Sequence, residues 1–261
     1  MASEVEPKGK LPPQSWIAAP ETQAVLDALE AGGAQVRFVG GCVRDALAKK
    51  ESVADIDIAT PEPPDLVIER LQAAGIRAIP TGLAHGTVTA LIGEQKFEIT
   101  ALRHDVETDG RRAKVRFTDD WEADAARRDF TINAMSCTRN GDIYDPFGGL
   151  EDLGHGRVCF VGIARDRIAE DTLRLLRFFR FYAIYGRPPA DIEALLACRD
   201  MAPNLAQLSG ERIRDEFFRI LLAPQAAEIV GLMRGERVIE HLLPEVRADN
   251  VGRLRLMAWL E

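Results

Sequence analysis

The chain has 261 residues, 46% of them hydrophobic and 28% charged, so it can bury a substantial core and form more than one domain. Its net charge of −8 disfavours a general nucleic-acid binder, because phosphate affinity comes from Lys and Arg, but a local group of arginines is compatible with it. No apolar run approaches the roughly 20 residues that cross a bilayer, so no membrane association is expected.

The N-terminal segment Met1–Ser15 is polar, contains prolines and lacks a hydrophobic centre. It predicts a loose arm and excludes a secretory signal. The cysteines lie far apart, without the paired spacing of a zinc site, and indicate reduced thiols in a cytoplasmic protein. They are Cys42, Cys137, Cys159 and Cys198.

Short strand-like and helical runs alternate in the first half of the chain, as the hydrophobic periodicity shows. The predicted elements are a strand at Gln35–Val39, a helix from Gly40-Gly41 to Lys49, a strand at Asp55–Ala59, a helix at Asp65–Ala73, and a hairpin of Thr87–Ile92 and Lys96–Ala101 around Gly93. Leu102–Asp120 is polar and charged, with a turn signal at Asp109-Gly110, and predicts a long mobile loop.

Helical patterns dominate from Ile163 onward, with breaks at Gly186–Pro189, at Ser209-Gly210 and near Pro224. We therefore expect an arm and first helix over residues 1–33, an α+β domain with a mixed sheet over 34–160, and an all-helical part over 161–261.

The most informative stretch is Asp55-Ile56-Asp57-Ile58. Residues i and i+2 of a strand share a face, so the two aspartates point together, with Cα atoms about 7 Å apart. Carboxylates in this arrangement can bridge two hard cations, whereas two solvent-facing aspartates are the alternative. Aspartate is a poor strand former, which favours metal binding.

A double glycine, Gly40-Gly41, precedes this strand and is followed by Arg44. Such a turn lets backbone N–H groups approach phosphate oxygens, and Arg44 is one helical turn away. The G-x-G-x-x-G fingerprint of dinucleotide-binding proteins is absent, so that class is rejected. A tight turn without a ligand is the alternative, but glycines, an arginine and an Asp-x-Asp strand together indicate phosphates and divalent metal in one cleft.

The segments Gly40–Asp45 and Asp55–Thr60 resemble the first motif of class II CCA-adding enzymes and bacterial poly(A) polymerases, in the polymerase-β-like nucleotidyltransferase superfamily. Five ordered motifs cover about Val36 to Leu222. The four others are Arg127–Ala134, Tyr144–Leu153, Glu170–Phe181 and Ser209–Leu222, which resemble the ribose motif, the hinge, the base-selecting motif and the last neck motif. The resemblance implies a nucleotidyltransferase head followed by a helical neck.

The resemblance also implies roles for individual residues. Asp55 and Asp57 would hold Mg²⁺ for catalysis, with Glu98 as a further candidate acid. The nucleotide would be bound by Gly40, Gly41, Arg44, Arg128, Asp171, Arg174, Arg177 and Arg180. Within this set, Asp171 and Arg174 would bond the edge of C or A as a protein template. Arg177 and Arg180 would orient that template or meet phosphate, while scattered surface arginines are the alternative.

The implied activity is template-independent addition of C and A to the 3′ end of tRNA from CTP and ATP, releasing pyrophosphate. A poly(A) polymerase and a CC-only or A-only enzyme share these motifs, and a non-catalytic nucleotide- or RNA-binding module is the alternative from another class. Relatives carry a flexible loop at the position of Leu102–Asp120, needed to add the final A, and a connection without function is the alternative there. Relatives also continue beyond the neck, whereas this chain ends at Glu261 in a predicted helix, Leu254–Leu260. Two interpretations of this sequence remain open: it is a fragment of a longer protein, or it has a reduced tRNA-binding part.

Overall fold

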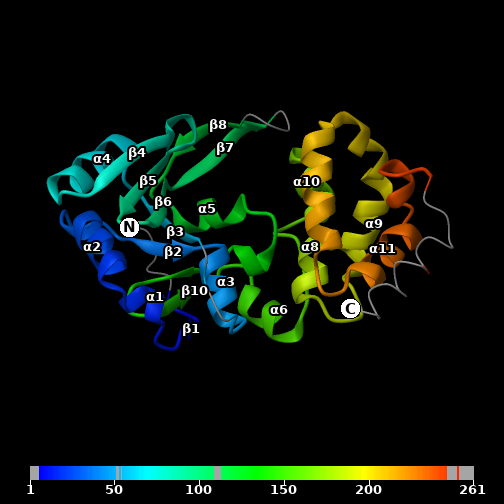
Figure 1. Ribbon diagram of the computed structural model, residues 1–261, viewed down its shortest axis with the longest axis horizontal. Coiled ribbons are helices and arrows are strands. Elements are labelled where there is room, and N and C mark those ends of the chain that lie inside the picture. Colours follow the sequence, from blue (N-terminus) through cyan, green and yellow to red (C-terminus); the bar gives the residue numbers. More distant parts are fainter. Residues whose placement is uncertain (1–5, 51–52, 54, 109–112, 246–251, 253–261) are drawn as a thin grey trace. The chain divides into compact units, whose positions relative to one another are not determined.

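The computed structural model describes residues 6–50, 53, 55–108, 113–245 and 252. They form two compact units, the first extending to Leu150 and the second beginning at Glu151 (Figure 1). Within these ranges, no helix combines the length and hydrophobicity needed to span a bilayer. The helix predicted at Leu254–Leu260 lies outside the described residues.

Eight strands of the first unit form one sheet in the order β1-β10-β9-β2-β3-β6-β5-β4. The pair β3–β6 is parallel and the other pairs are antiparallel, which confirms the predicted mixed sheet. The strands are β1 (Gly9–Lys10), β2 (Arg37–Val39), β3 (Ile56–Thr60), β4 (Arg77–Gly82), β5 (Thr87–Ile92), β6 (Gln95–Ala101), β9 (Ser136–Cys137) and β10 (Asp142–Tyr144).

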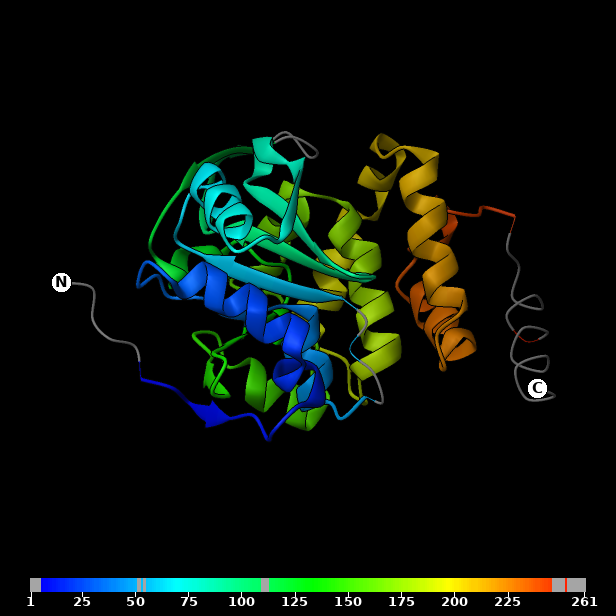
Figure 2. The ribbon, with the colours of Figure 1, turned by 60° about the vertical axis from the view of Figure 1, so that its left-hand side comes forward.

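Alternating residues of the central strands build a core on one face of this sheet. Phe38 pairs with Ile58, and Ile58 with Ile99, and all three side chains are buried. Trp16 of helix α1 (Ser15–Ala18) packs edge-on against Phe38. Helices α2 (Pro20–Glu30) and α4 (Pro64–Ala73) pack against each other, and α4 packs against β4 and β5 (Figure 2). The opposite face carries the intervening residues of β2, β3 and β6, including Asp57.

Three short elements complete the first unit. Helix α1 (Ser15–Ala18) precedes α2, and helix α3 (Gly41–Leu47) connects β2 toward β3. Helix α5 (Trp121–Ala126) covers the second face of the sheet, where Trp121 packs against Val39 and Ala59. Helix α6 (Gly149–His155) spans the division between the units.

The loose arm predicted for Met1–Ser15 is wrong at Gly9 and Lys10. These residues form β1, in register with Ile143 and Asp142 of β10, and Lys10 Nζ lies 2.7 Å from an Asp142 carboxylate oxygen. The partner strand is more than 130 residues away in sequence, so no local pattern indicates the pairing.

The loop predicted for Leu102–Asp120 is also wrong over most of its length. Strands β7 (Arg103–Thr108) and β8 (Ala113–Phe117) pair antiparallel as a separate two-stranded ribbon. Its base is joined to the main sheet, because Leu102 N donates to Thr60 O and Thr118 N donates to Leu102 O. Asp109-Gly110 and the two arginines after it lie outside the described residues. Antiparallel strands can present polar side chains to water, so a polar sequence does not exclude a ribbon.

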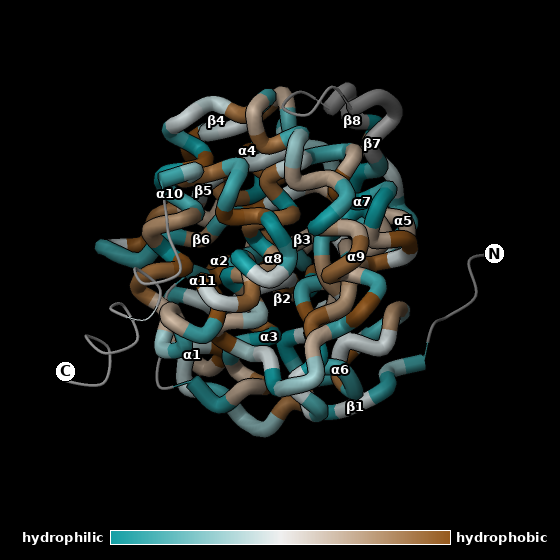
Figure 3. Tube along the Cα trace, turned by 90° about the vertical axis from the view of Figure 1, so that its right-hand side faces the viewer, coloured by the Kyte–Doolittle hydropathy of each residue, from teal (hydrophilic) through white to brown (hydrophobic). Residues whose placement is uncertain are grey.

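The second unit is helical, as expected from the periodicity after Ile163. Hydrophobic and hydrophilic segments alternate within its helices, as amphipathic packing requires (Figure 3). Its helices are α7 (Ala164–Glu170), α8 (Leu173–Tyr185), α9 (Ile192–Met201), α10 (Gly210–Leu221) and α11 (Ala226–Gly235). Helix α8 packs against α10 and α11, and α7 packs against α9.

Candidate active site

The Asp-x-Asp pair lies at the start of β3. Asp55 immediately precedes the strand and is exposed, whereas Asp57 lies within it and is partly buried. Glu98 of β6 is in register with Asp57, so its side chain points to the same face. Burial and the charge of Glu98 raise the pKa of Asp57 to about 6, with a further contribution from Asp55, against the lowering effect of Arg128 and Arg44. The fold therefore concentrates negative charge here.

The double glycine lies beside this carboxylate. Gly40 has φ of 69° and ψ of −123°, a conformation that strongly favours glycine. A Cβ atom at Gly40 would lie 3.0 Å from Arg128 Nη1 and 3.9 Å from Asp57 Oδ2. The missing side chain at Gly40 therefore lets Arg128 approach the turn closely, and three of the predicted site residues, Gly40, Arg128 and Asp57, lie next to one another.

Arg44 lies close to the same turn. A Cβ atom at Gly41 would lie 3.7 Å from Arg44 Nη2. Arg44 is 9% exposed, and it donates to Asn133 Oδ1 at 2.5 Å and to Asp45 Oδ1 at 2.9 Å. Asn133 in turn donates to the buried Asp129 at 2.9 Å. This network holds Arg44 against Asn133 in the segment Arg127–Ala134, so a phosphate contact would be made from that position.

The predicted base-selecting pair belongs to the second unit. Asp171 lies in extended backbone between α7 and α8, and not on the helix, because α8 begins at Leu173. Its carboxylate accepts two hydrogen bonds from Arg212 Nη2, at 3.0 and 2.8 Å, and one from the backbone of Leu173. Arg174 donates to Glu170 at 2.5 Å. The structure thus orients both side chains through partners that were not predicted.

Arg177 and Arg180 lie further along α8, whose apolar side chains are largely buried. Arg177 lies over the Phe181 ring at 5.3 Å. Arg180 Nε donates to Glu216 Oε1 at 2.5 Å, and Glu216 is only 4% exposed. Burial lowers the pKa of Arg180, with Glu216 acting in the opposite direction. The contact of these two arginines with nucleotide stays a prediction.

The Arg180–Glu216 ion pair is expected to stabilise the fold. Glu216→Ala leaves a mostly buried guanidinium, 14% exposed, without its carboxylate and should lower the free energy of unfolding by about 3 kcal/mol. The matched control is Asp215→Ala on the same helix, whose pair with Arg214 is 58% and 61% exposed and should matter by less than about 1 kcal/mol. Urea unfolding followed by circular dichroism measures both. Equal effects of the two substitutions would contradict the assigned burial.

The residues at this site fit a divalent cation by their chemistry. In the part of the chain that the structure describes, no group of three or more His, Cys, Asp or Glu side chains is arranged to hold a metal ion. Asp55 and Asp57, with Glu98 beside Asp57, nevertheless supply the oxygen ligands that hard cations prefer. Burial and then repulsion from Glu98 and Asp55 raise the pKa of Asp57, and a bound cation would relieve that repulsion.

Two protein-family models match segments of this chain. Residues 36–159 match the model of the poly A polymerase head domain, and residues 191–249 match that of the probable RNA and SrmB-binding site of polymerase A. The mitochondrial CCA tRNA nucleotidyltransferase 1 of Homo sapiens is 47% identical over 202 residues, covering 76% of this chain and 46% of that protein. The chain belongs to the CCA-adding enzyme and poly(A) polymerase family.

Other members of this family show the same extent of similarity. The CCA-adding enzyme of Leuconostoc mesenteroides is 40% identical over 233 residues, covering 88% of this chain and 56% of that enzyme. The crystal structure of the Bacillus stearothermophilus CCA-adding enzyme in complex with CTP superimposes with a TM-score of 0.78 at 33% identity, covering 92% of this chain and 58% of that one. The chain therefore spans about half the length of the relatives that it matches.

Proposed function

We propose that this protein adds C and A to the 3′ end of tRNA, using CTP and ATP and releasing pyrophosphate. The observation that carries the proposal is that Gly40, Arg128 and Asp57 lie next to one another in the first unit. Relatives support the substrate class. One similar structure, at 27% identity and a TM-score of 0.68 over 86% of this chain and 63% of that one, is a tRNA nucleotidyltransferase complexed with a primer tRNA and an incoming ATP analog.

In this proposal the reaction is attack of the RNA 3′-hydroxyl on the α-phosphate of the nucleotide, with pyrophosphate as the leaving group. Asp55 and Asp57 would hold Mg²⁺, which when bound neutralises charge on the phosphate oxygens and activates the hydroxyl. The Gly40-Gly41 backbone would let the triphosphate approach closely, because neither residue carries a Cβ atom. Arg44 and Arg128 would provide positive charge for the nucleotide from positions that the surrounding side chains fix.

Base selection in this proposal belongs to Asp171 and Arg174. A carboxylate accepts from the exocyclic amino group that C and A share, and a guanidinium donates to a ring nitrogen or carbonyl oxygen. U and G lack that amino group at the same position, so the pair discriminates against them. Arg177 and Arg180 would support this helix or contact phosphate.

The test is an extension assay with magnesium, labelled CTP or ATP, and tRNA lacking its last three nucleotides. We expect the product to stop after two C and one A. Long A tails would instead identify a poly(A) polymerase, and arrest after CC or addition of A alone would identify a partial enzyme. Absence of any incorporation under conditions that support a known relative would favour the non-catalytic binding module.

The β7–β8 ribbon makes a further prediction for this activity. Deleting Val106–Lys114 removes its outer part and should leave C addition near the wild-type rate while A addition fails, as the resemblance implies for this region. Primer extension with CTP alone and then with ATP separates the two steps. Completion of CCA at the normal rate by the deletion variant would mean that the ribbon is only a connection.

A further inference from the structure

Asp124 lies on α5, three and four residues before Arg127 and Arg128, and is only 3% exposed. Its Oδ1 accepts from Arg127 Nε at 2.9 Å, and its Oδ2 accepts from Arg128 Nη2 at 3.3 Å. Burial alone would raise the pKa of Asp124, but the charges of Arg128 and Arg127 outweigh it and hold that pKa below its usual value. The carboxylate is therefore ionised at neutral pH.

The same carboxylate reaches the base of the ribbon. Its Oδ1 accepts from the backbone N–H of Arg103, the first residue of β7, at 3.2 Å. Helix α5 packs against β7 and is fixed to the sheet through Trp121, whose ring lies 4.2 Å from the guanidinium carbon of Arg37. Asp124 thus connects three separate parts of the first unit: α5, the ribbon and the arginine beside Gly40.

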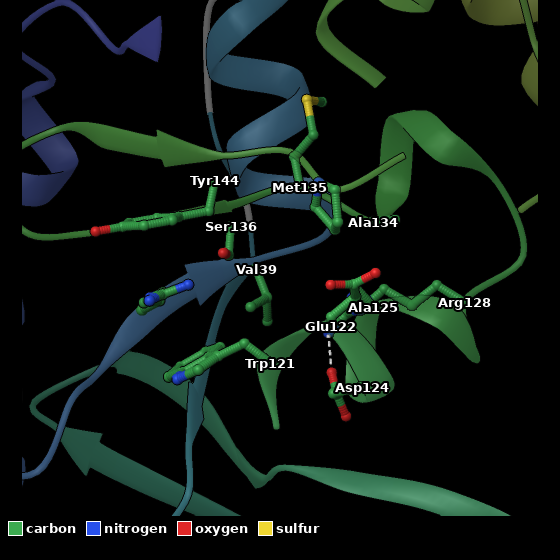
Figure 4. A pocket seen from close by; sticks show the side chains of 12 residues that line it. Val39, Trp121, Glu122, Asp124, Ala125, Arg128, Ala134, Met135, Ser136 and Tyr144 are labelled. Atoms are coloured by element: carbon green, nitrogen blue, oxygen red, sulfur yellow. Dashed lines mark hydrogen bonds and ion pairs between the residues drawn. The ribbon is translucent and has the colours of Figure 1, made fainter. Parts of the chain in front are cut away.

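The Arg128 guanidinium has two hydrogen-bond partners within the described residues. It donates to Asp124 Oδ2 at 3.3 Å and to the backbone oxygen of Asn133 at 3.4 Å, and of these two partners only Asp124 carries a charge. The side chain is 20% exposed, so water can replace Asp124 as a partner and the guanidinium can turn away from Gly40. Figure 4 shows Trp121, Asp124 and Arg128 from this segment lining one pocket with Val39, Ser136 and Tyr144 from three strands.

We propose that Asp124 is a positioning residue, which aims Arg128 at the incoming nucleotide and fixes the first residue of the β7–β8 ribbon. This inference rests on the proposed function. If the Asp124 carboxylate acts through Arg128, the changes in binding free energy caused by substituting the two residues are not additive.

The test is a double-mutant cycle on the full chain with Asp124→Asn, Arg128→Ala and the combined variant. Direct CTP binding by calorimetry and the extension assay provide independent readouts. We expect Asp124→Asn to weaken CTP binding and raise KM by about tenfold, with a smaller fall in kcat, since misplacing a contact by about 1 Å can cost up to about a hundredfold. The combined variant should bind CTP no more weakly than Arg128→Ala alone.

Two further variants separate positioning from general stability. Asp142→Asn removes another ion pair of the first unit, at the sheet edge, and should leave KM unchanged. Asp124→Glu keeps the charge, and it is the measured variant if Asp124→Asn does not fold. It should raise KM by less than Asp124→Asn and show the same non-additivity with Arg128→Ala.

Additive effects in the cycle, or unchanged CTP binding in a folded Asp124 variant, would overturn the proposal. Failure of the wild-type protein to extend tRNA would instead count against the proposed function. The calorimetric cycle still distinguishes the two cases, because it does not depend on turnover.

Discussion

Asp57→Asn and Asp55→Asn are each expected to lower nucleotide incorporation at least about a thousandfold, equivalent to roughly 4 kcal/mol of transition-state stabilisation. The physical reason is the loss of a carboxylate from a pair that faces one side of β3. Glu98 points to the same face, but in the described residues it does not complete a group of three side chains that could hold a metal ion. The measurement is single-turnover incorporation of labelled CTP into primer tRNA.

The same substitution at Asp57 should not weaken the fold. Burial and Glu98 raise the pKa of Asp57 to about 6, above its unfolded value of 3.8, so the folded protein binds this proton more tightly than the unfolded one. Ionisation therefore costs stability as the pH rises through this range. At pH 7.5 without divalent cations, Asp57→Asn should keep or raise the melting temperature.

The matched control is Glu94→Gln, in the exposed turn between β5 and β6, which should leave incorporation unchanged. Turnover within tenfold of wild type in either aspartate variant would contradict the metal role. A large fall in the melting temperature of Asp57→Asn would contradict the assigned electrostatics.

Asp171→Ala and Arg174→Ala are expected to reduce discrimination of CTP and ATP against UTP and GTP by about 10- to 100-fold. A good pair of hydrogen bonds to a base edge is worth about 1–3 kcal/mol of discrimination. The measurement is the ratio of kcat/KM values for the four nucleotides, which separates a change in choice from a general slowing.

Arg165→Ala is the matched control, because Arg165 also pairs with an aspartate of the second unit, Asp200, but on an exposed surface. It should leave the ratios unchanged. Arg212→Ala removes both hydrogen bonds from Arg212 to the Asp171 carboxylate and should shift the ratios in the same direction as Asp171→Ala, though less far. Unchanged nucleotide preference in both Asp171 and Arg174 variants would remove the templating role.

Local patterns were sufficient where the signal lies within a few residues. Strict alternation predicted β3 within one residue at each end, and the glycine break predicted the β5–β6 hairpin. The double glycine predicted the turn before α3. In these cases side-chain periodicity and backbone freedom act over the same short range as the structure that they specify.

Such local patterns could not predict contacts between residues far apart in the chain. The pairing of β1 with β10, and the bonds from Arg212 to Asp171, join residues far apart in the chain. Arg180 and Glu216 are 36 residues apart, so their burial together could not be inferred from the arginine spacing on one helix. Two missed features had a local signal. Asp124 precedes Arg127 and Arg128 by three and four residues, the spacing of helical ion pairs, and Ala113–Phe117 alternates as a strand does.

The most direct test of the proposed activity is sequencing of the 3′ ends that the protein makes. Primer tRNA lacking its terminal CCA is incubated with magnesium and all four nucleotides, beside a parallel reaction with Asp57→Asn. We predict that the wild-type products end in CCA and stop there, and that the variant leaves the primer unchanged. Wild-type ends of any other sequence, or extension by the variant at the wild-type rate, would contradict the proposed function.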